Sequence, residues 1–176
     1  LGRAAQRLGV GDAVIAMPEA SHQDRRRALE MCSQAGLRAM ALPGPVRALA
    51  ALADQALVDL DGFARDRALS GVQLDRAVAD SGIATIAGTR HALAPARLEA
   101  LRQAMLEHLA AFHEENADLQ GLGRERLRLM LEPRLPKDVF AAFIRAEAEA
   151  GRIALDGAFL RLPGHLPRLS PEDEAL

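Results

Sequence analysis

The sequence predicts a mainly α-helical protein with small β hairpins, preceded by a short α/β segment. Three observations predict this class. After Pro95, apolar residues recur at spacings of three and four, which is the period of an amphipathic helix. Asp156-Gly157 stands between two alternating runs, the strongest local signal for a hairpin. Near the N-terminus, "AVIAMP" (13–18) is a short apolar run that ends at a proline, as buried parallel strands do.

Composition limits the kind of core that the chain can build. The chain has 176 residues, 49% of them hydrophobic, with neither Trp nor Tyr. Much of the apolar share is alanine, which buries little area, so we expect small, helix-rich cores. The net charge of −2 excludes a strongly basic coat, and any phosphate contact must therefore come from a local patch.

Residues 1–44 are predicted to form a βαβ, Rossmann-like fragment. A short helix around Ala4, Ala5 and Leu8 comes first, followed by the strand 13–18. The helix 21–36 has Ser21 as its N-cap, Leu29 and Cys32 on one side, and Gly36 as its stop. The second strand is 37–43. Two strands cannot form a covered parallel sheet alone, so this fragment requires more sheet or another partner.

Residues 45–94 are predicted to be more helical. We expect a helix over 46–60, two shorter helical stretches within 62–82 that part near Ser70-Gly71, and a weaker hairpin over 83–93. This segment shows no clear first strand.

Residues 95–169 give the clearest order of elements. A helix runs from Pro95 through His113, a short extended stretch lies within 115–123, and helices follow at 124–134 and 136–151. The predicted buried residues of the last two helices are Leu127, Met130, Leu131, Val139, Phe140, Phe143 and Ile144. The hairpin closes the domain, and 170–176 is the start of a further helix or a tail. Helix, strand, helix, helix, hairpin is the order of a winged helix, and 45–94 repeats it in degenerate form. We therefore predict tandem winged-helix domains.

The hairpin has two chemically different faces. A two-residue turn at Asp156-Gly157 would pair Ala154 with Phe159 and Arg152 with Arg161. Period-two geometry then groups the aliphatic residues Ile153, Leu155, Ala158, Leu160 and Leu162 on one face.

Arg152, Phe159 and Arg161 share the opposite face of this hairpin. Guanidinium groups beside an aromatic ring suit nucleic-acid binding. The alternatives are that the arginine stems cover Phe159 in water, or that a neighbouring domain buries it.

The helix 124–134 is the other candidate for an anionic contact. It carries a balance of +2, and Arg124 and Arg128 lie four residues apart on one face. Solvated arginines are the alternative. The helix 136–151 has a balance of −1, which argues against major-groove DNA binding and hence against a winged-helix DNA-binding regulator.

Motifs for catalysis or cofactors are missing from the sequence. There is neither a GxxxxGK[ST] phosphate loop nor a GxGxxG, and His108 and His113 lie five apart, so a helix turns them away from each other. We expect a non-enzymatic protein with no cofactor, no catalytic residue and no metal. One cysteine, Cys32, points to a reducing compartment such as the cytoplasm. No apolar run approaches the roughly 18 residues of a membrane span.

Residues 67–176 resemble a family. The ordered blocks "LAAFHEEN", "GLGRERLR", "LPKDVF" and "RLPGHLPRLSPE", with "SGVQLDRAVADSG" upstream, are similar to winged-helix repeats from the C-terminal arm of the bacterial selenocysteine-specific elongation factors (SelB). In that family a GTPase body delivers selenocysteyl-tRNA, and the arm links it to an RNA hairpin in the messenger. The resemblance implies a translation module whose partners are this selenocysteine-insertion hairpin or the ribosome, reached indirectly through further repeats. The family's direct RNA contact belongs to the last repeat, so the resemblance implies a spacer role here.

Residues 1–43 resemble a different family, the N-terminal Rossmann-like region of nucleotide-sugar epimerase/dehydratases of polysaccharide biosynthesis. This leaves a second hypothesis, a fragment of such an enzyme. The chain starts with leucine, and the accounts left open are a fragment, an unusual fusion, a gene-call artefact or a recruited βα segment.

Overall fold

The computed structural model describes residues 7, 9–15, 17, 20–41 and 43–167, and the chain divides into two compact units, Leu1–Leu49 and Ala50–Leu176. The helix expected around Ala4, Ala5 and Leu8 and the further helix or tail expected at 170–176 lie outside the described residues.

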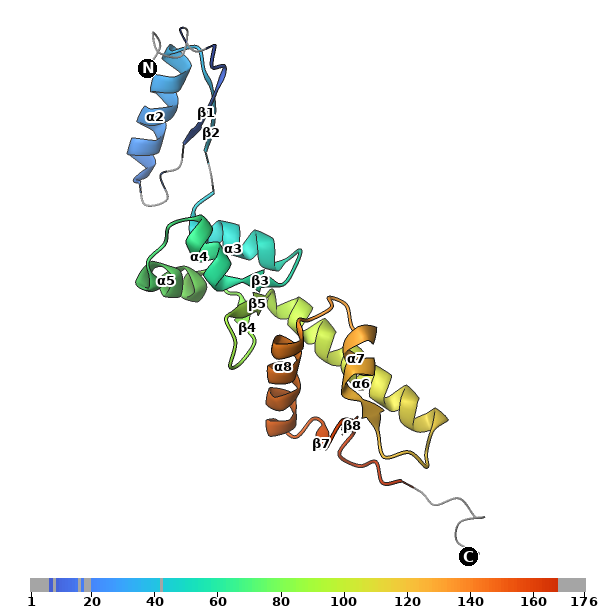
Figure 1. Ribbon diagram of the computed structural model, residues 1–176. Coiled ribbons are helices and arrows are strands. Elements are labelled where there is room, and N and C mark those ends of the chain that lie inside the picture. Colours follow the sequence, from blue (N-terminus) through green and yellow to red (C-terminus); the bar gives the residue numbers. More distant parts are fainter. Residues whose placement is uncertain (1–6, 8, 16, 18–19, 42, 168–176) are drawn as a thin grey trace, which may run out of the picture. The chain divides into compact units, whose positions relative to one another are not determined.

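The first unit is a strand–helix–strand segment. β1 (Asp12–Ile15) and β2 (Arg38–Ala41) pair in parallel, with Val14 opposite Met40, and α2 (His22–Gln34) connects them. α2 lies along one face of the two strands (Figure 1). Its predicted N-cap is confirmed, because the Ser21 hydroxyl accepts from the Asp24 N–H at 3.1 Å.

The small core of this unit corrects one expectation. Cys32 is buried, with Ile15, Leu37 and four alanines around it, but Leu29 is 39% exposed. The inward stripe of α2 runs through Ala28, Cys32 and Ala35, which are spaced by four and three residues. Leu29 is one residue off that stripe and therefore turns to solvent.

The second unit contains two modules with similar element order. After α3 (Pro45–Ala53), the first module consists of β3 (Val58–Asp59), α4 (Leu60–Asp66), α5 (Gly71–Ser81), β4 (Ala84–Thr85) and β5 (His91–Leu93). The second module consists of α6 (Pro95–Glu115), β6 (Leu122–Gly123), α7 (Arg124–Met130), α8 (Lys137–Glu149), β7 (Ala154–Asp156) and β8 (Phe159–Arg161). Each module has an antiparallel sheet in which its last strand is central, in the orders β3-β5-β4 and β6-β8-β7. The fold is thus mainly helical with small antiparallel sheets, as predicted.

The prediction of a helix over 46–60 without a first strand is wrong. α3 ends at Ala53, and Val58 pairs with Ala92 of β5. The Asp59 carboxylate then caps α4 by accepting from the Asp61 N–H at 3.0 Å. Pairing with a strand more than thirty residues away overrides the local helical spacing. A short window of sequence contains no information about that pairing.

The second helix of the second module is shorter than predicted. α7 ends at Met130 rather than continuing to 134, because Leu131 is extended (φ −83, ψ 143). Pro133 and Pro136 restrict this segment to non-helical backbone. Met130 is consequently 41% exposed instead of buried, whereas Leu131 and Leu135 are buried.

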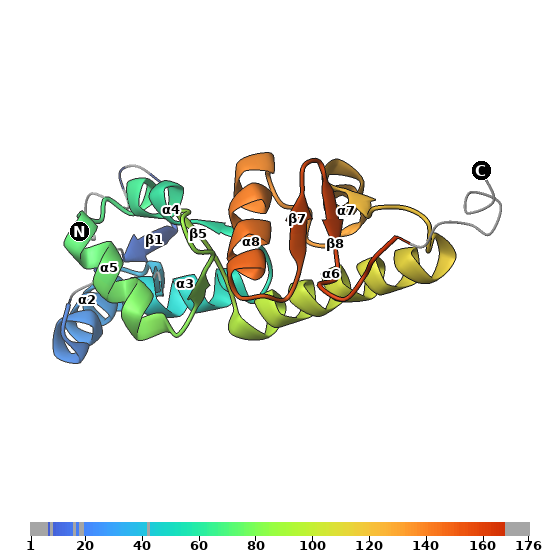
Figure 2. The same ribbon diagram turned by 90° about the horizontal axis from the view of Figure 1, so that it is seen from below.

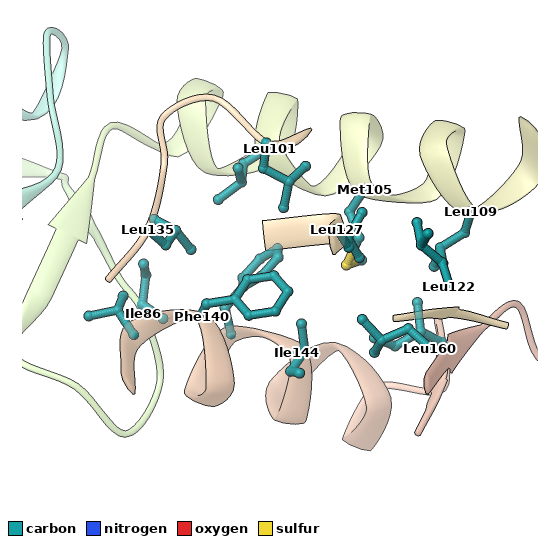
Figure 3. Packing of buried hydrophobic residues seen from close by; sticks show 14 of the residues in the cluster. Ile86, Leu101, Met105, Leu109, Leu122, Leu127, Leu135, Phe140, Ile144 and Leu160 are labelled. Carbon is teal, nitrogen blue, oxygen red and sulfur yellow. The ribbon is translucent and has the colours of Figure 1, made fainter. Parts of the chain in front are cut away.

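One hydrophobic core fills the second module and extends beyond it. Leu127 and the predicted inner face of α8, Val139, Phe140, Phe143 and Ile144, are buried as expected, and Leu101, Met105 and Leu109 of α6 pack with them. Ile86 and Leu93, from the hairpin of the first module, belong to the same cluster (Figure 3). The two modules therefore share buried side chains.

Candidate nucleic-acid interface

The β7–β8 hairpin lies beside α8, in the second module (Figure 2). Its inner face is confirmed at Ile153 and Leu160, which are 3% and 0% exposed. Leu155, at the tip, is 37% exposed, so the apolar face is not wholly buried. Phe159 is 40% exposed and lies opposite Gly123 of β6, which offers no side chain to cover it.

The predicted register of this hairpin is wrong by two residues. Leu155 pairs with Leu160 and Ala154 with Arg161, so the turn is at Gly157-Ala158. Gly157 takes the positive φ of 57 that the first turn position requires. Arg152 and Arg161 are therefore not opposite each other. Since side chains alternate with a period of two, a slip of two residues leaves every side chain on its predicted face.

Arg152 is held by the protein itself. Its guanidinium forms an ion pair with the carboxylate of Glu147 on α8, which is 2% exposed. Arg102 of α6 reaches the same carboxylate, with its Nε 3.0 and 3.1 Å from the two oxygens, and also pairs with Glu99. The hydrogen bond and the charge of Glu147 raise the pKa of Arg152, so this residue stays cationic. The sequence did not reveal Glu147, because only the fold brings α6, α8 and the hairpin together.

Arg128 and Arg161 also have internal partners. Arg128 donates to both oxygens of Glu125 at 2.9 and 2.7 Å and to the Leu135 carbonyl at 2.8 Å. The hydrogen bond to Glu125 raises the pKa of Arg128 and lowers that of Glu125. Arg161 donates to the His165 carbonyl at 3.0 Å. These contacts leave fewer donors for an external phosphate than the sequence predicts.

Arg124 is an exposed member of the predicted cations. It is exposed at the start of α7, and its backbone N–H donates to the Ala158 carbonyl at 3.0 Å, beside Phe159. The fold thus brings the backbone of Arg124, which follows β6, next to the start of β8 at Phe159, and it assigns Arg128 and Arg152 to internal ion pairs. Arg124 and Phe159, which are both exposed, therefore stay the predicted contacts for a phosphate and a base.

A buried histidine is a further feature that the sequence analysis missed. His113 is 9% exposed near the end of α6, and its Nε2 accepts the Leu162 N–H at 3.2 Å. Its ring stacks on that of His165, with centroids 3.6 Å apart and planes 11° from parallel. Burial, followed by the charges of His165 and Arg161, lowers the pKa of His113. Its spacing of four from Leu109 was a sequence signal for an inward position.

Neither a metal centre nor a membrane span is found in the described part of the chain. Among those residues no group of three or more His, Cys, Asp or Glu side chains could hold a metal ion. None of the described helices combines the length and the hydropathy that crossing a bilayer requires.

The second module has the helix–strand–helix–helix–hairpin order of the winged-helix class, with a three-stranded sheet closed by its hairpin. Comparison with family models places it within that class: residues 106–162 match the family described as elongation factor SelB, winged helix. The chain is also 32% identical over 129 residues to the selenocysteine-specific elongation factor of Escherichia coli (strain K12), covering 73% of this chain and 21% of that protein.

The chain thus spans about a fifth of the length of the curated relative that it matches. The matches support a winged-helix module of a translation elongation factor, in agreement with the resemblance seen over residues 67–176. The resemblance of residues 1–43 to nucleotide-sugar enzymes stays a prediction.

Proposed function

We propose that this chain is a non-catalytic part of the winged-helix arm of a selenocysteine-specific elongation factor. In this proposal residues 45–94 and 95–169 are tandem winged helices, and they act as a rigid spacer between the GTPase body and the selenocysteine-insertion RNA hairpin. The chain itself needs no cofactor, works in the cytoplasm, and reaches the hairpin or the ribosome through neighbouring parts of the arm. The similarity to the E. coli factor and the winged-helix match support this assignment.

The observation that carries the spacer role is the core shared by the two modules. Ile86 is 2% and Leu93 0% exposed, and both pack in the cluster that contains Leu101, Leu135 and Phe140 (Figure 3). Side chains buried in a common core cannot move apart without exposing apolar area to water. Relative motion of the modules is therefore opposed by the hydrophobic effect.

The backbone connection between the two modules is short. β5 ends at Leu93 and α6 begins at Pro95, with Ala94 alone between them. The Ala94 N–H donates to the Ala53 carbonyl at 3.1 Å, and Arg97 Nη1 donates to the Asp54 carbonyl at 3.1 Å. These bonds fix the start of α6 to the end of α3. A connection of this kind transmits orientation from one module to the next.

Backbone ¹⁵N relaxation tests this rigidity. We expect the two modules to report one rotational correlation time, and Ile86→Ala to give each module its own, shorter time. The change removes buried methyl groups from the shared core and leaves a cavity there. Val72→Ala is the matched control, because Val72 is 80% exposed on α5 and its loss should change nothing. Separate correlation times in the unmodified chain would contradict a rigid spacer.

A gel-shift titration against a selenocysteine-insertion hairpin, at two salt concentrations, tests for direct RNA contact. Arg124→Glu is the informative variant because Arg124 is exposed, whereas a change at Arg152 would also disturb Glu147. The spacer role predicts the same affinity and the same salt dependence as for Arg145→Glu, an exposed control on α8. A salt slope smaller by about one for Arg124→Glu alone would show a phosphate contact and reject a pure spacer.

A further inference from the structure

The segment after β8 is held down by the stacked pair of histidines. Residues 162–167 follow β8 and turn back between Leu162 and His165, where the His165 N–H donates to the Leu162 carbonyl at 3.0 Å. We call these residues the strap. Four hydrogen bonds hold it: Leu162 N–H to His113 Nε2, His165 Nε2 to the Leu119 carbonyl at 2.8 Å, and Arg161 Nη1 to the Pro163 and His165 carbonyls.

Two of these contacts specify the protonation of the rings. A backbone N–H can only donate, so Nε2 of His113 must be unprotonated to accept from Leu162. A carbonyl can only accept, so Nε2 of His165 must carry its hydrogen toward Leu119. A proton added to His113 would go to Nε2, where it would face the Leu162 N–H and remove the hydrogen bond.

The groups around His113 oppose its protonation. His165 stacks on it from the strap, Arg161 approaches from β8, and the guanidinium of Arg126 on α7 lies 5.7 Å from the neighbouring Phe112 ring. On α6 itself, Glu114 and Glu115 are exposed. The end of a helix favours a cation, but burial and, after it, the electrostatic effects of His165 and Arg161 prevail, since the pKa of His113 is lowered.

We propose that the His113–His165 stack is a pH-sensitive latch, which holds the strap closed when both rings are neutral and releases it when His113 gains a proton. Protonation removes the Leu162 hydrogen bond and places an imidazolium against a second imidazole and Arg161. Release would uncover the end of α6 and free the chain that leaves the second module.

The direction of the pH dependence follows from the proton count. Because the pKa of His113 is lower in the folded state than its ordinary value of about 6.5, the closed state binds fewer protons than the open one. The latch is therefore fully closed above that value and weakens as the pH falls below it. Below the lowered pKa the closed state has lost the whole contribution that the pKa difference of His113 made to it.

Amide hydrogen exchange of the full 176-residue chain tests the latch. Between pH 7.5 and pH 5, after correction for intrinsic exchange, we expect protection of the Leu162 amide to fall by up to about tenfold per pH unit between the open-state pKa of His113 and its lowered closed-state pKa. Protection of Leu160, a residue of the sheet, should not change. Equal protection of Leu162 at both pH values would overturn the proposal.

Two variants separate the titration from mere structural support. His113→Gln keeps an acceptor and cannot titrate, so Leu162 should stay protected at low pH, whereas His108→Gln, on the same helix, should behave as the unmodified chain. If His113→Gln lowers Leu162 protection at every pH, a second variant, His165→Phe, distinguishes titration of His113 from a merely structural role. That variant keeps a stacked ring but removes an imidazole whose electrostatic effect lowers the pKa of His113, and the NMR titration midpoint of His113 should then rise. An unchanged midpoint would reject the coupling between the rings.

Discussion

Replacing Glu147 with glutamine is expected to lower the free energy of unfolding by about 3 kcal/mol, because it removes the buried carboxylate that Arg102 and Arg152 share and leaves Arg102 with the half-exposed Glu99 as its anionic partner. The Glu147 side chain is 3% exposed and that of Arg102 22%, so water can compensate little of the loss. Arg152 is 40% exposed and can rehydrate. The measurement is urea unfolding at pH 7, followed by circular dichroism because the chain has neither Trp nor Tyr.

Glu149→Gln is the matched control for this change. Glu149 lies two residues further along α8 and is exposed. Its neutralisation should therefore change the free energy of unfolding by no more than about 0.5 kcal/mol. A joint Arg102→Leu and Glu147→Leu variant should recover part of the lost stability, since apolar pairs of similar volume often replace buried ion pairs without cost. If Glu147→Gln were as stable as Glu149→Gln, the buried ion pairs would not contribute to folding.

Gly121→Ala should destabilise the second module by about 3 kcal/mol, at the upper end for an overpacked site. A Cβ at this position would lie 2.4 Å from the carbonyl oxygen of Leu160 and 3.0 Å from its carbonyl carbon. Leu160 belongs to the central strand β8, whose backbone is fixed by partners on both sides. Relief therefore requires β6 and β8 to separate, and the same unfolding experiment measures the loss.

Gly123→Ala provides the comparison two residues away. A Cβ there meets nothing within 4 Å, so only capping and chain-entropy effects remain, and these together should stay below about 1 kcal/mol. The Met105 methyl resonance, which reports on the core beneath the sheet, should shift in Gly121→Ala and not in Gly123→Ala. Equal stability of the two variants would mean that β6 can move away from β8 freely.

The β7–β8 hairpin shows what the alternation of apolar and polar residues can predict and what it cannot. The pattern of residues 152–162 correctly predicted that Ile153 and Leu160 point inward and that Phe159 is exposed. It placed the two-residue turn one position too early, at Asp156-Gly157 instead of Gly157-Ala158. The preference of Gly157 for a positive φ can be met in either of these turns. The assignment of side chains to the two faces of the hairpin stayed correct only because the register was shifted by an even number of residues.

The candidate site was less predictable than the fold. The sequence pointed to five residues by charge and aromatic character, and the ion pairs of Arg128 and Arg152 were not predicted. Arg128 pairs with Glu125 within one helical turn, which the i, i+3 spacing could have indicated. Arg152 pairs with Glu147 across a helix end, and Arg102 arrives there from 45 residues away. No local pattern encodes that meeting.

By itself the sequence determined the order of the helices and hairpins, the inner face of α8 and the likeness of its C-terminal part to the arm of a selenocysteine-specific elongation factor. These depend on periodicity and on short motifs, which are local properties of the chain. Only the tertiary structure decided that β3 exists, that Ile86 joins the core of the next module, and that His113 meets His165. Each of these depends on groups distant in sequence, whose contact is set by the packing of the whole unit.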